Sequence, residues 1–473
     1  MAGVTRSNGA ALDRLNDLWR AAGGADDALD RVSITGEDPV LPSNFRVGTA
    51  AAATIAAAGL AASEIWRLRT GRKQTVSLEM LAAAIAFRSE RYLTVDGEPY
   101  RNLWDPIAGY YQTGDGRWLQ LHTNFPHHRD GVLELLHCAN SREGVERALQ
   151  DWSGQEIEDA LAAAGLCAGM LRSPAEWQAH PQGQAVARLP LFEIERIGDA
   201  PAEGFGPGDR PLSDVLVLDL TRVIAGPVCG RNLAEHGAEV MRIAGPHLPY
   251  MPPLVVDSGR GKRSAFVDLR RPEGRDRLAS LVRESDVFVQ GYRPGAIAGR
   301  GFSPEALAEL RPGIVCVSLC AYGREGPWRD RRGFDSLVQT VSGIAWEGGQ
   351  AAGVDGPKPL PAQALDHATG YLAAFGAMMA LARRAEEGGS WHVRVSLAQT
   401  GRWIDGLGRV DGLDHPEPDE QTIAPYMQTT ESPFGLTRHV APVVRLSETP
   451  PYWAIPAVPL GTHPAEWPAR RAA

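Results

Sequence analysis

The sequence of 473 residues has little cysteine and no long apolar run. Its cysteines are odd in number, scattered and without a C-x-x-C pair, which argues against a disulfide framework and a zinc site. The longest apolar stretch, residues 50–62, is rich in alanine and shorter than the roughly 20 residues of a membrane-spanning helix. The start, MAGVTRSNGAALDRLNDLWR, has no continuous apolar segment typical of a secretory signal. We therefore expect a cytoplasmic protein without a membrane partner.

An excess of basic residues is also absent. The chain has 48 Lys and Arg against 57 Asp and Glu, a net charge of −9. Nucleic acid would have to be bound by a local basic patch against the overall field, so we expect no such partner. Apolar residues make up 44% of the chain, which is enough to fill a core and excludes disorder of the whole chain.

Composition and patterning divide the chain into five parts. The run GDAPAEGFGPGDRPLS, residues 198–213, is rich in Pro, Gly and Asp and predicts a linker. Before it, a buried helix over residues 48–69, a short strand over 74–78, a hairpin around Gly114–Gly116 and helical patterns over 130–137 and 144–164 are expected. The predicted parts are 1–100, a degenerate helix–strand copy; 101–197, a small α+β domain; the linker; 214–400, a doubly wound domain; and 401–473, an extended segment.

Alternating strands and helices follow the linker. The run VLVLDL, residues 215–220, is typical of a strand buried on both faces. Four further predicted strands, near residues 239–243, 287–290, 314–319 and 393–397, alternate with helical segments. This pattern predicts the α/β class with a doubly wound, mostly parallel, Rossmann-like sheet.

Two helix–strand segments resemble each other. Residues 360–397, LPAQALDHATGYLAAFGAMMALARR…VRVSL, and residues 41–78, LPSNFRVGTAAAATIAAAGLAASEIWRL…QTVSL, share their opening Leu-Pro and closing Val-Ser-Leu at one constant offset. They are either copies of one unit or two buried helices that converged on alanine and leucine. If they are copies, the two helices should pack together in related positions, and we expect no carboxylate at the start of the first.

Asp366 precedes an apolar helix predicted over residues 369–383. Its side chain could cap that helix, or a carboxylate held there without water could act as a nucleophile. Basic residues outnumber acidic ones between Asp257 and Arg275, which could indicate phosphate binding or a solvated face. The P-loop spacing is absent, because Arg263 stands where the hydroxyl residue should be.

Other catalytic patterns are missing from the sequence. His122, His127 and His128 lack the spacing and acidic partner of a metal helix, so we expect surface histidines and no metal. No G-x-S-x-G elbow supports a serine hydrolase, and no G-x-G-x-x-G follows Leu220 to support a nicotinamide site.

Five ordered blocks after the linker resemble the family III coenzyme A (CoA) transferases, which include formyl-CoA and carnitine-CoA transferases. They are VLDLTRVIAGPVCGRNLAEHGAEVMRI (217–243), GRGKRSAFVDLRRPEGRDRLASLVRESDVFVQGYRPGAI (259–297), AYGREGP (321–327), GFDSLVQTVSG (333–343) and LDHATGYLAAFGAMMAL (365–381). The hairpin near residue 115, residues 162–183 and PVVRLSET (442–449) resemble other parts of the family.

The order of these parts differs from the family, in which the doubly wound domain precedes the small domain. This sequence looks permuted, with a partial duplication ahead of both parts. The resemblance implies an interlocked homodimer, and the duplication leaves a pseudo-dimeric monomer as the alternative.

The resemblance implies that Asp366 is the nucleophile. It would attack an acyl-CoA thioester to give an aspartyl anhydride, CoA would form an aspartyl-CoA thioester, and a carboxylic acid acceptor would take the CoA. Backbone N–H groups of the glycine turn 346–350 are candidates for stabilising the tetrahedral intermediates.

The resemblance also implies a CoA site and no cofactor beyond the CoA substrate. Its residues in this sequence are Val223, Ile224, Ala225, Lys262, Tyr292, Arg293 and Tyr322. Ala244 and Gly291 stand where the family usually has Glu and Asn, which weakens the nucleotide end of the site.

Two alternative functions remain open from sequence. A racemase or isomerase branch shares the fold but places His before the Asp of the G-x-D segment, where this chain has Phe334. A catalytically inactive CoA-binding paralogue would explain Val47, at the position equivalent to Asp366 in the first copy, and the changed Ala244 and Gly291.

Overall fold

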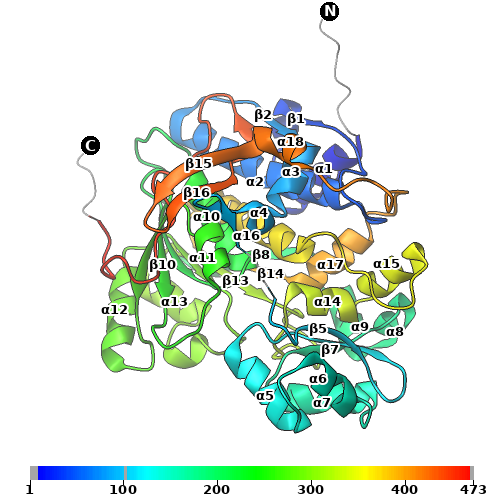
Figure 1. Ribbon diagram of the computed structural model, residues 1–473. Coiled ribbons are helices and arrows are strands. Elements are labelled where there is room, and N and C mark those ends of the chain that lie inside the picture. Colours follow the sequence, from blue (N-terminus) through cyan, green and yellow to red (C-terminus); the bar gives the residue numbers. More distant parts are fainter. Residues whose placement is uncertain (1–8, 101–103, 469–473) are drawn as a thin grey trace, which may run out of the picture.

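A seven-stranded sheet forms the centre of the protein (Figure 1). The computed structural model describes residues 9–100 and 104–468. Six strands run parallel, and the seventh, β8, pairs antiparallel with β14 at one edge. In spatial order the strands are β11 (Lys262–Phe266), β10 (Glu239–Ala244), β9 (Leu216–Leu220), β12 (Val287–Gln290), β13 (Val315–Cys320), β14 (Ser390–Ser396) and β8 (Phe192–Gly198). The predicted mixed α/β class with a large parallel sheet is confirmed.

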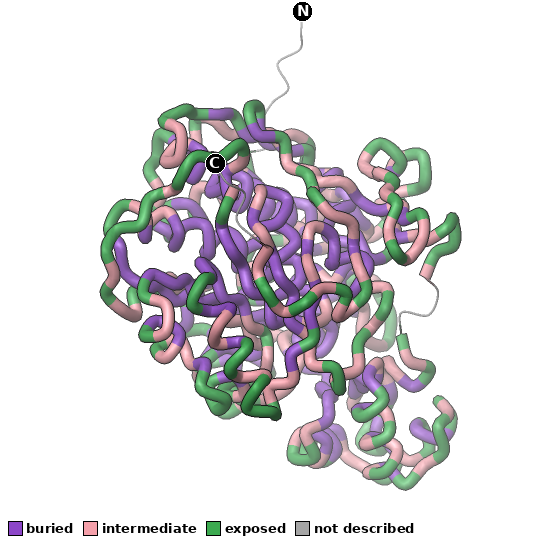
Figure 2. Tube along the Cα trace, turned by 90° about the vertical axis from the view of Figure 1, so that its left-hand side faces the viewer, coloured by how far each residue is buried: buried purple, intermediate pink, exposed green. Residues whose placement is uncertain are grey.

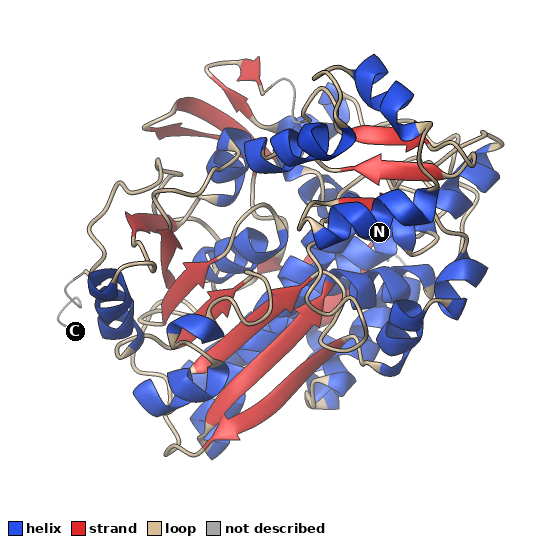
Figure 3. Cartoon of the chain, turned by 90° about the horizontal axis from the view of Figure 1, so that it is seen from below, coloured by secondary structure: helices blue, strands red, loops and turns tan. Residues whose placement is uncertain are grey.

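Alternating side chains of the strands fill two cores, one on each face of the sheet. Val217 of β9 belongs to the core formed with α10 and α16, whereas its neighbour Leu218 belongs to the core formed with α12 and α13. Both faces of β9 are therefore buried, as its continuous apolar sequence predicts. Figure 3 shows the strands of this sheet side by side, with helices before and behind them. The covering helices are α10 (Ala225–Glu235), α16 (Ala364–Glu387), α12 (Pro272–Val282) and α13 (Pro304–Leu310).

The helices of the two similar segments, residues 41–78 and 360–397, pack directly against each other. Helix α2 (Val47–Thr70) lies against α16, and each of these helices has 24 residues. Helix α2 is apolar and long enough to cross a membrane, but 94% of its apolar window is buried inside the protein, so it is a core helix. The elements around it are α1 (Gly9–Ala21), η1 (Asp26–Arg31), β1 (Val32–Thr35), β2 (Val76–Glu79), α3 (Met80–Ala86) and α4 (Ser89–Tyr92).

A carboxylate does stand at the start of α2, contrary to the expectation from sequence. Asp38 accepts hydrogen bonds from the backbone N–H groups of Gly48 at 2.9 Å and Thr49 at 2.8 Å, and from the Thr49 hydroxyl at 2.7 Å. The residue lies several positions before the helix and reaches its first turn through the intervening loop. Local sequence around Val47 could not reveal this cap, since the contact depends on how that loop folds.

A small α/β unit packs below the main sheet in Figure 1. It contains the predicted hairpin, but the single helix expected over residues 144–164 is two helices, because Ser153 and Glu156 form a capping box that starts a new one. The strand β8 follows this unit in sequence and joins the main sheet, so the sheet begins before the expected linker. The elements are β5 (Gly109–Gln112), β6 (Trp118–Leu121), β7 (Ala168–Met170), α5 (Pro126–Leu136), α6 (Arg142–Leu149) and α7 (Gly154–Ala163).

Strands near the C-terminal end of the chain pair with strands near its N-terminal end. Strand β17 (Arg445–Leu446) pairs with β2, and β16 (Gly435–Val440) pairs with β15 (Met427–Ser432) and β3 (Thr94–Val95). In Figure 2 buried residues gather through the middle of the molecule and exposed residues at its rim. The remaining elements are β4 (Glu98–Pro99), α8 (Pro174–Ala179), α9 (Pro181–Arg188), α11 (Pro252–Ser258), η2 (Ala298–Arg300), α14 (Asp335–Val341), α15 (Ile344–Ala352), α17 (Leu397–Asp405), α18 (Glu420–Ile423) and η3 (Ala424–Tyr426).

The close approach of α16 and α10 predicts an unusual response to a Gly→Ala change. A Cβ on Gly370 would lie 2.5 Å from the Ala225 carbonyl oxygen and 2.7 Å from the Val228 Cβ. We expect Gly370→Ala to lower the free energy of unfolding in urea by about 1–3 kcal/mol through overpacking. The control Gly299→Ala, where nothing lies within 4 Å, should change it by less than about 0.5 kcal/mol. A gain of about 0.5–1 kcal/mol for Gly370→Ala, as helix propensity alone predicts, would contradict this packing.

Candidate active site

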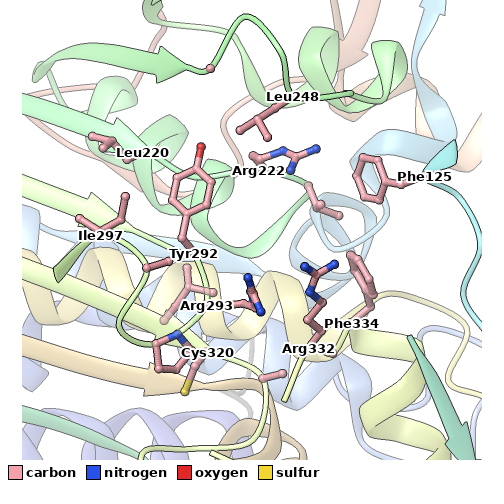
Figure 4. Close-up of a pocket in the computed structure, with 18 of the residues that line it drawn as sticks. Phe125, Leu220, Arg222, Leu248, Tyr292, Arg293, Ile297, Cys320, Arg332 and Phe334 are labelled. Carbon is pink, nitrogen blue, oxygen red and sulfur yellow. The ribbon is translucent and has the colours of Figure 1, made fainter. Parts of the chain in front are cut away.

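A cavity of about 430 Å³ lies where the parallel strands of the main sheet end (Figure 4). The loops after β9, β10, β12 and β13 meet there because the carboxyl ends of parallel strands share one edge of a sheet. They contribute Arg222, Gly245, Tyr292 and Ala321 in turn. The small unit closes the cavity with Phe125, His127, His128 and Cys167. The site therefore lies between the main sheet and the small unit.

Asp366 lines this cavity from the first turn of α16. The helix begins at Ala364 and not at Thr369, so Asp366 is its third residue and Gln363 is the N-cap. The Asp366 side chain is 7% exposed and accepts no hydrogen bond from any residue in the described ranges. Of the two roles considered for Asp366, the helix cap is therefore wrong, and the carboxyl group is free to face the cavity.

Asp335 performs the capping role instead. Its carboxylate accepts the Asp366 backbone N–H through Oδ2 at 2.9 Å and is bonded through Oδ1 by the side-chain amide of Gln339. Asp335 is completely buried at the start of α14. Two carboxyl groups thus meet at the N-terminus of α16, one against the backbone and the other at the cavity.

Burial and like charge both raise the pKa of the Asp366 carboxyl well above its usual range. Burial is the largest cause, followed by repulsion from Asp335 and then Glu90. The pKa of Asp335 is also raised, chiefly by burial and against the effect of its hydrogen bonds. Such paired carboxyl groups titrate as a unit and not independently.

Cations dominate the rest of the cavity wall. Asp366 is the sole acidic side chain among the described residues that line it, against six arginines. Arg270 pairs with Asp268, and Arg331 lies 3.7 Å from Glu158. The other four have no carboxylate partner in the part of the chain that the structure describes; these are Arg222, Arg293, Arg300 and Arg332. Figure 4 shows Arg222, Arg293 and Arg332 around the opening of the cavity. The cavity is therefore suited to an anionic ligand.

Two of the three histidines predicted at the surface, His122 and His128, are buried, whereas His127 is exposed as predicted. His122 and His128 are 5% and 3% exposed, and the His122 ring stacks on Phe334 with centroids 3.7 Å apart. Burial lowers the pKa of His122 to about 4 and that of His128 to about 3, so both rings are neutral near pH 7. His127 and His128 line the cavity beside Cys167. The burial of His122 and His128 could not be read from sequence, because it depends on the docking of the small unit.

Four of the residues expected to bind CoA line this cavity. They are Val223, Ala225, Tyr292 and Arg293. Val223 has a φ of 71°, which is rare for a β-branched residue and costs conformational energy. The positive φ of Val223 turns the backbone between β9 and α10 at the cavity wall. Gly291, where the family usually has Asn, also lines the cavity.

Two more of the expected residues lie behind the cavity wall. Ile224 is 8% exposed and packs into the main core, and Tyr322 is completely buried against the Trp328 ring, with centroids 5.2 Å apart. The Tyr322 hydroxyl has no hydrogen-bond partner among the described residues. The cleft expected to be lined by Tyr322 is therefore lined instead by the adjacent Ala321.

Lys262 is not placed to meet a ligand in this cavity. It is 1% exposed, and its Nζ donates at 2.7 Å to the Asp219 carboxylate and at 2.7 Å to the Pro227 carbonyl. Burial lowers its pKa to about 8 despite the neighbouring Asp219. The expectation that Lys262 binds CoA phosphates is wrong, because its ammonium group forms a buried ion pair with Asp219. Of the basic stretch that contains it, Arg270 lines the cavity.

The expected glycine turn at residues 346–350 is also corrected. These residues lie inside helix α15, and none of them lines the cavity. A Cβ on Gly348 or Gly349 would meet the carbonyl oxygens of Lys358 or Gly356 at 2.2 and 1.9 Å. The glycines therefore allow a chain segment to pack closely, which explains them without a catalytic role.

Sequence reasoning missed Arg222, Arg332 and Asp335 as parts of the site. Arg222 could have been found, since it follows the first strand directly and precedes Val223. Arg332 lies in the segment before α14 and Asp335 is the first residue of α14, and their place at the site is set by tertiary packing alone.

Comparison with known proteins matches the chain to one family. The family model described as CoA-transferase family III matches residues 31–193 and 212–408. The chain is 29% identical over 414 residues to the acyl-CoA transferase of Gibberella moniliformis, covering 78% of this chain and 72% of that protein. It is 30% identical over 322 residues to the acetyl-coenzyme A transferase nodX of Hypoxylon pulicicidum, covering 63% and 54%.

Shorter matches include proteins with named substrates. Human succinyl-CoA:glutarate CoA-transferase is 37% identical over 183 residues, covering 36% of this chain and 41% of that protein. The crystal structure of Rv3272 from Mycobacterium tuberculosis gives 29% identity and a TM-score of 0.37, covering 42% of this chain and 59% of that chain. The chain thus spans about half the length of several of these relatives.

The buried contacts of Lys262 predict a structural role for it. We expect Lys262→Met to lower the free energy of unfolding in urea by about 3–5 kcal/mol, because it leaves the Asp219 carboxylate buried without its charge partner. The neighbouring Arg263→Met, which breaks a partly exposed pair with Glu239, should cost about 1 kcal/mol or less. Wild-type stability of Lys262→Met would return Lys262 to the list of ligand-binding residues.

Proposed function

The chain belongs to CoA-transferase family III, and we propose that it moves CoA from an acyl-CoA donor to a carboxylic acid, with Asp366 as nucleophile. One observation carries this proposal: a buried, unbonded carboxylate faces a cavity whose other charged side chains are cations. The acyl-CoA and the acid are substrates, and the proposal needs no further cofactor.

The order of the strands supports a place for CoA. The spatial order β11, β10, β9, β12, β13, β14 supports a doubly wound, Rossmann-like sheet, because successive strands are added on one side of β9 up to β11 and on its other side from β12 to β14. Ligands of such sheets bind at the switch point, here between β9 and β12. Arg270, Arg300 and His247 line the cavity toward β10 and β11, which suits the nucleotide phosphates. The thioester would then reach Asp366 beyond β12.

The reaction divides one exchange into easier covalent steps. An Asp366 carboxylate oxygen attacks the thioester carbonyl, the C–S bond breaks, and an acyl–aspartyl anhydride and CoA thiolate form. The thiolate attacks the aspartyl carbonyl of the anhydride, which releases the donor acid and leaves an aspartyl-CoA thioester. The acceptor carboxylate repeats these steps in reverse, so that acyl-CoA leaves and Asp366 is restored.

The site offers less to the alternative functions. Phe334, which stands before Asp335, stacks on His122 and cannot carry a proton, so the acid–base pair of a racemase or isomerase is incomplete. The inactive paralogue has no support in the names of the relatives, which describe transferases. The homodimer and the five predicted parts of the chain remain proposals, as does the cytoplasmic location.

Replacing the nucleophile gives the first test of this function. We expect Asp366→Ala and Asp366→Asn to lower the rate of CoA exchange at least about a thousandfold, measured with a panel of acyl-CoA donors and acids. The free energy of unfolding should not fall, because the Asp366 side chain caps nothing and its removal relieves repulsion with Asp335. Wild-type turnover in either variant would refute the covalent mechanism.

Two of the arginines that lack a carboxylate partner give a second test. We expect Arg222→Gln and Arg332→Gln each to weaken CoA binding about tenfold or more, since hydrogen bonds to charged groups contribute roughly 1.5–3 kcal/mol. The loss, measured by calorimetry, should shrink as salt screens the phosphates. The control Arg277→Gln changes an exposed arginine of α12 away from the cavity and should bind CoA as wild type does. Equal affinity of all four proteins would show that CoA binds elsewhere.

A further inference from the structure

Asp335, whose carboxyl group accepts a hydrogen bond from the first turn of α16, is an ionisable residue next to the proposed nucleophile. Asp335 is completely buried, and its Oδ2 accepts the Asp366 N–H at 2.9 Å. The Asp366 side chain is also more than nine-tenths buried, yet it accepts no hydrogen bond from the described residues and lines the cavity. The two acids therefore share one poorly hydrated space but have different partners.

Gln339 ties this pair to the segment that leads into the helix. Its Oε1 accepts the Leu360 N–H at 2.8 Å, while its Nε2 donates to Asp335 Oδ1 and, at 3.3 Å, to the Ala362 carbonyl. Helix α14 thus holds both the approach to α16 and its first turn. The position of the Asp366 backbone depends on Asp335 and Gln339 together.

A third carboxylate reaches the same place from helix α4, in the N-terminal part of the chain. Glu90 of α4 lies 3.1 Å from His367 Nε2, and His367 follows Asp366 in α16. Both residues are buried, with exposures of 5% and 0%. The Phe87 ring stacks on His367 with centroids 5.5 Å apart. The N-terminal part of the chain thereby places a negative group behind the nucleophile.

The charges around Asp366 are divided between two sides. Asp335 of α14 and Glu90 of α4 act on its carboxyl group from within the protein. Residues lining the cavity from α10 and α17, Ala225 and Leu397, are uncharged. The charged or titratable groups that line the cavity besides Asp366 are Arg222, Arg270, Arg293, Arg300, Arg331, Arg332, His127, His128, His247, Tyr292, Cys167 and Cys320. Carboxylates thus face Asp366 from the protein side, and cations face the ligand.

We propose that Asp335 is the positioning residue of the nucleophile, and that Asp335 and Asp366 share one proton in the resting protein. The hydrogen bond from the Asp366 N–H needs an acceptor, and Asp335 supplies it in either charge state. When the shared proton leaves to water in the cavity, Asp366 becomes the carboxylate that can attack a thioester. This inference rests on the proposed function, because it assigns a partner to the proposed nucleophile.

Two like charges in one buried space support this sharing. Mutual repulsion raises the pKa of one member of such a pair strongly. Since a raised pKa keeps a carboxyl group neutral up to higher pH, the reactive anion of Asp366 should appear only as the pH increases. Removing the Asp335 charge should let that anion form at lower pH.

The test compares the pH dependence of Asp366 in the wild-type protein and in three variants. The formation of the aspartyl adduct from succinyl-CoA is followed in single turnovers across the pH range in which the proteins stay folded. Asp335→Asn keeps an amide oxygen as hydrogen-bond acceptor. We expect it to move the midpoint of the pH dependence of adduct formation to lower pH by about one unit or more. Glu90→Gln should move it in the same direction by less. Asp335→Ala should be slower than Asp335→Asn at every pH, because it lacks the acceptor.

Asp38→Asn is the matched control. Asp38 caps the packed partner helix α2 as Asp335 caps α16, but no nucleophile stands beside it. If Asp335→Asn acted only by destabilising a helix, Asp38→Asn should shift the pH midpoint of adduct formation in the same way. If the two acids share a proton, the midpoint of Asp38→Asn should equal that of wild type. Equal midpoints for wild type, Asp335→Asn and Glu90→Gln would overturn the proposal, even if Asp335→Ala is inactive.

A second readout separates this proposal from the proposed function. The carbon-13 signals of the aspartate carboxyl groups, assigned with Asp366→Asn and Asp335→Asn, report protonation without any substrate. A coupled titration of the two residues that disappears in Asp335→Asn supports the shared proton even if succinyl-CoA yields no adduct, an outcome that would count against the function alone. Independent titration of Asp366 at the pH of an ordinary exposed carboxyl group would overturn the proposal.

Discussion

Burial of α16 on all sides is the constraint on which the site depends. The helix lies between α2, α10 and strands of the main sheet, so its axis cannot move without opening the core. Its first turn is fixed separately by the hydrogen bond from the Asp366 N–H to Asp335. A carboxylate placed at the third residue of such a helix cannot turn to bulk water, and it faces whatever enters the cavity.

The distribution of charge follows from the same arrangement. Inside the fold, Lys262 is neutralised by Asp219, and Arg172 is neutralised by Glu158 at 2.5 Å. Around the cavity, Arg222, Arg293 and Arg332 have no such partner among the described residues. Cations left without a carboxylate partner destabilise the protein alone and favour the state in which an anion is bound. The strained φ of Val223 at the same wall is a further local cost that a binding role explains.

The sequence was sufficient to predict elements that depend on local patterns, and to identify the family from motifs spread over many residues. The buried strand at residues 216–220, the helix at 47–70 and the hairpin near residue 115 follow from periodicity and turn residues. Five ordered blocks led to the family, and the match over residues 31–193 and 212–408 confirmed it. The predictions that failed concern residues whose roles depend on contacts between distant parts of the chain. Lys262 has the same appearance in sequence whether it meets a phosphate or Asp219, and neither Asp38 nor Asp335 can be assigned to a helix start before the loops are placed.

The central claim is that Asp366 becomes covalently linked to acyl or CoA groups during transfer, and peptide mapping by mass spectrometry tests it most directly. The protein is mixed with acyl-CoA donors without an acceptor, treated with hydroxylamine, and digested. We expect an aspartyl hydroxamate at Asp366 that is absent without donor, and none at the adjacent Asp335. A label on Asp335, on Cys167 or on no residue with any donor would contradict it.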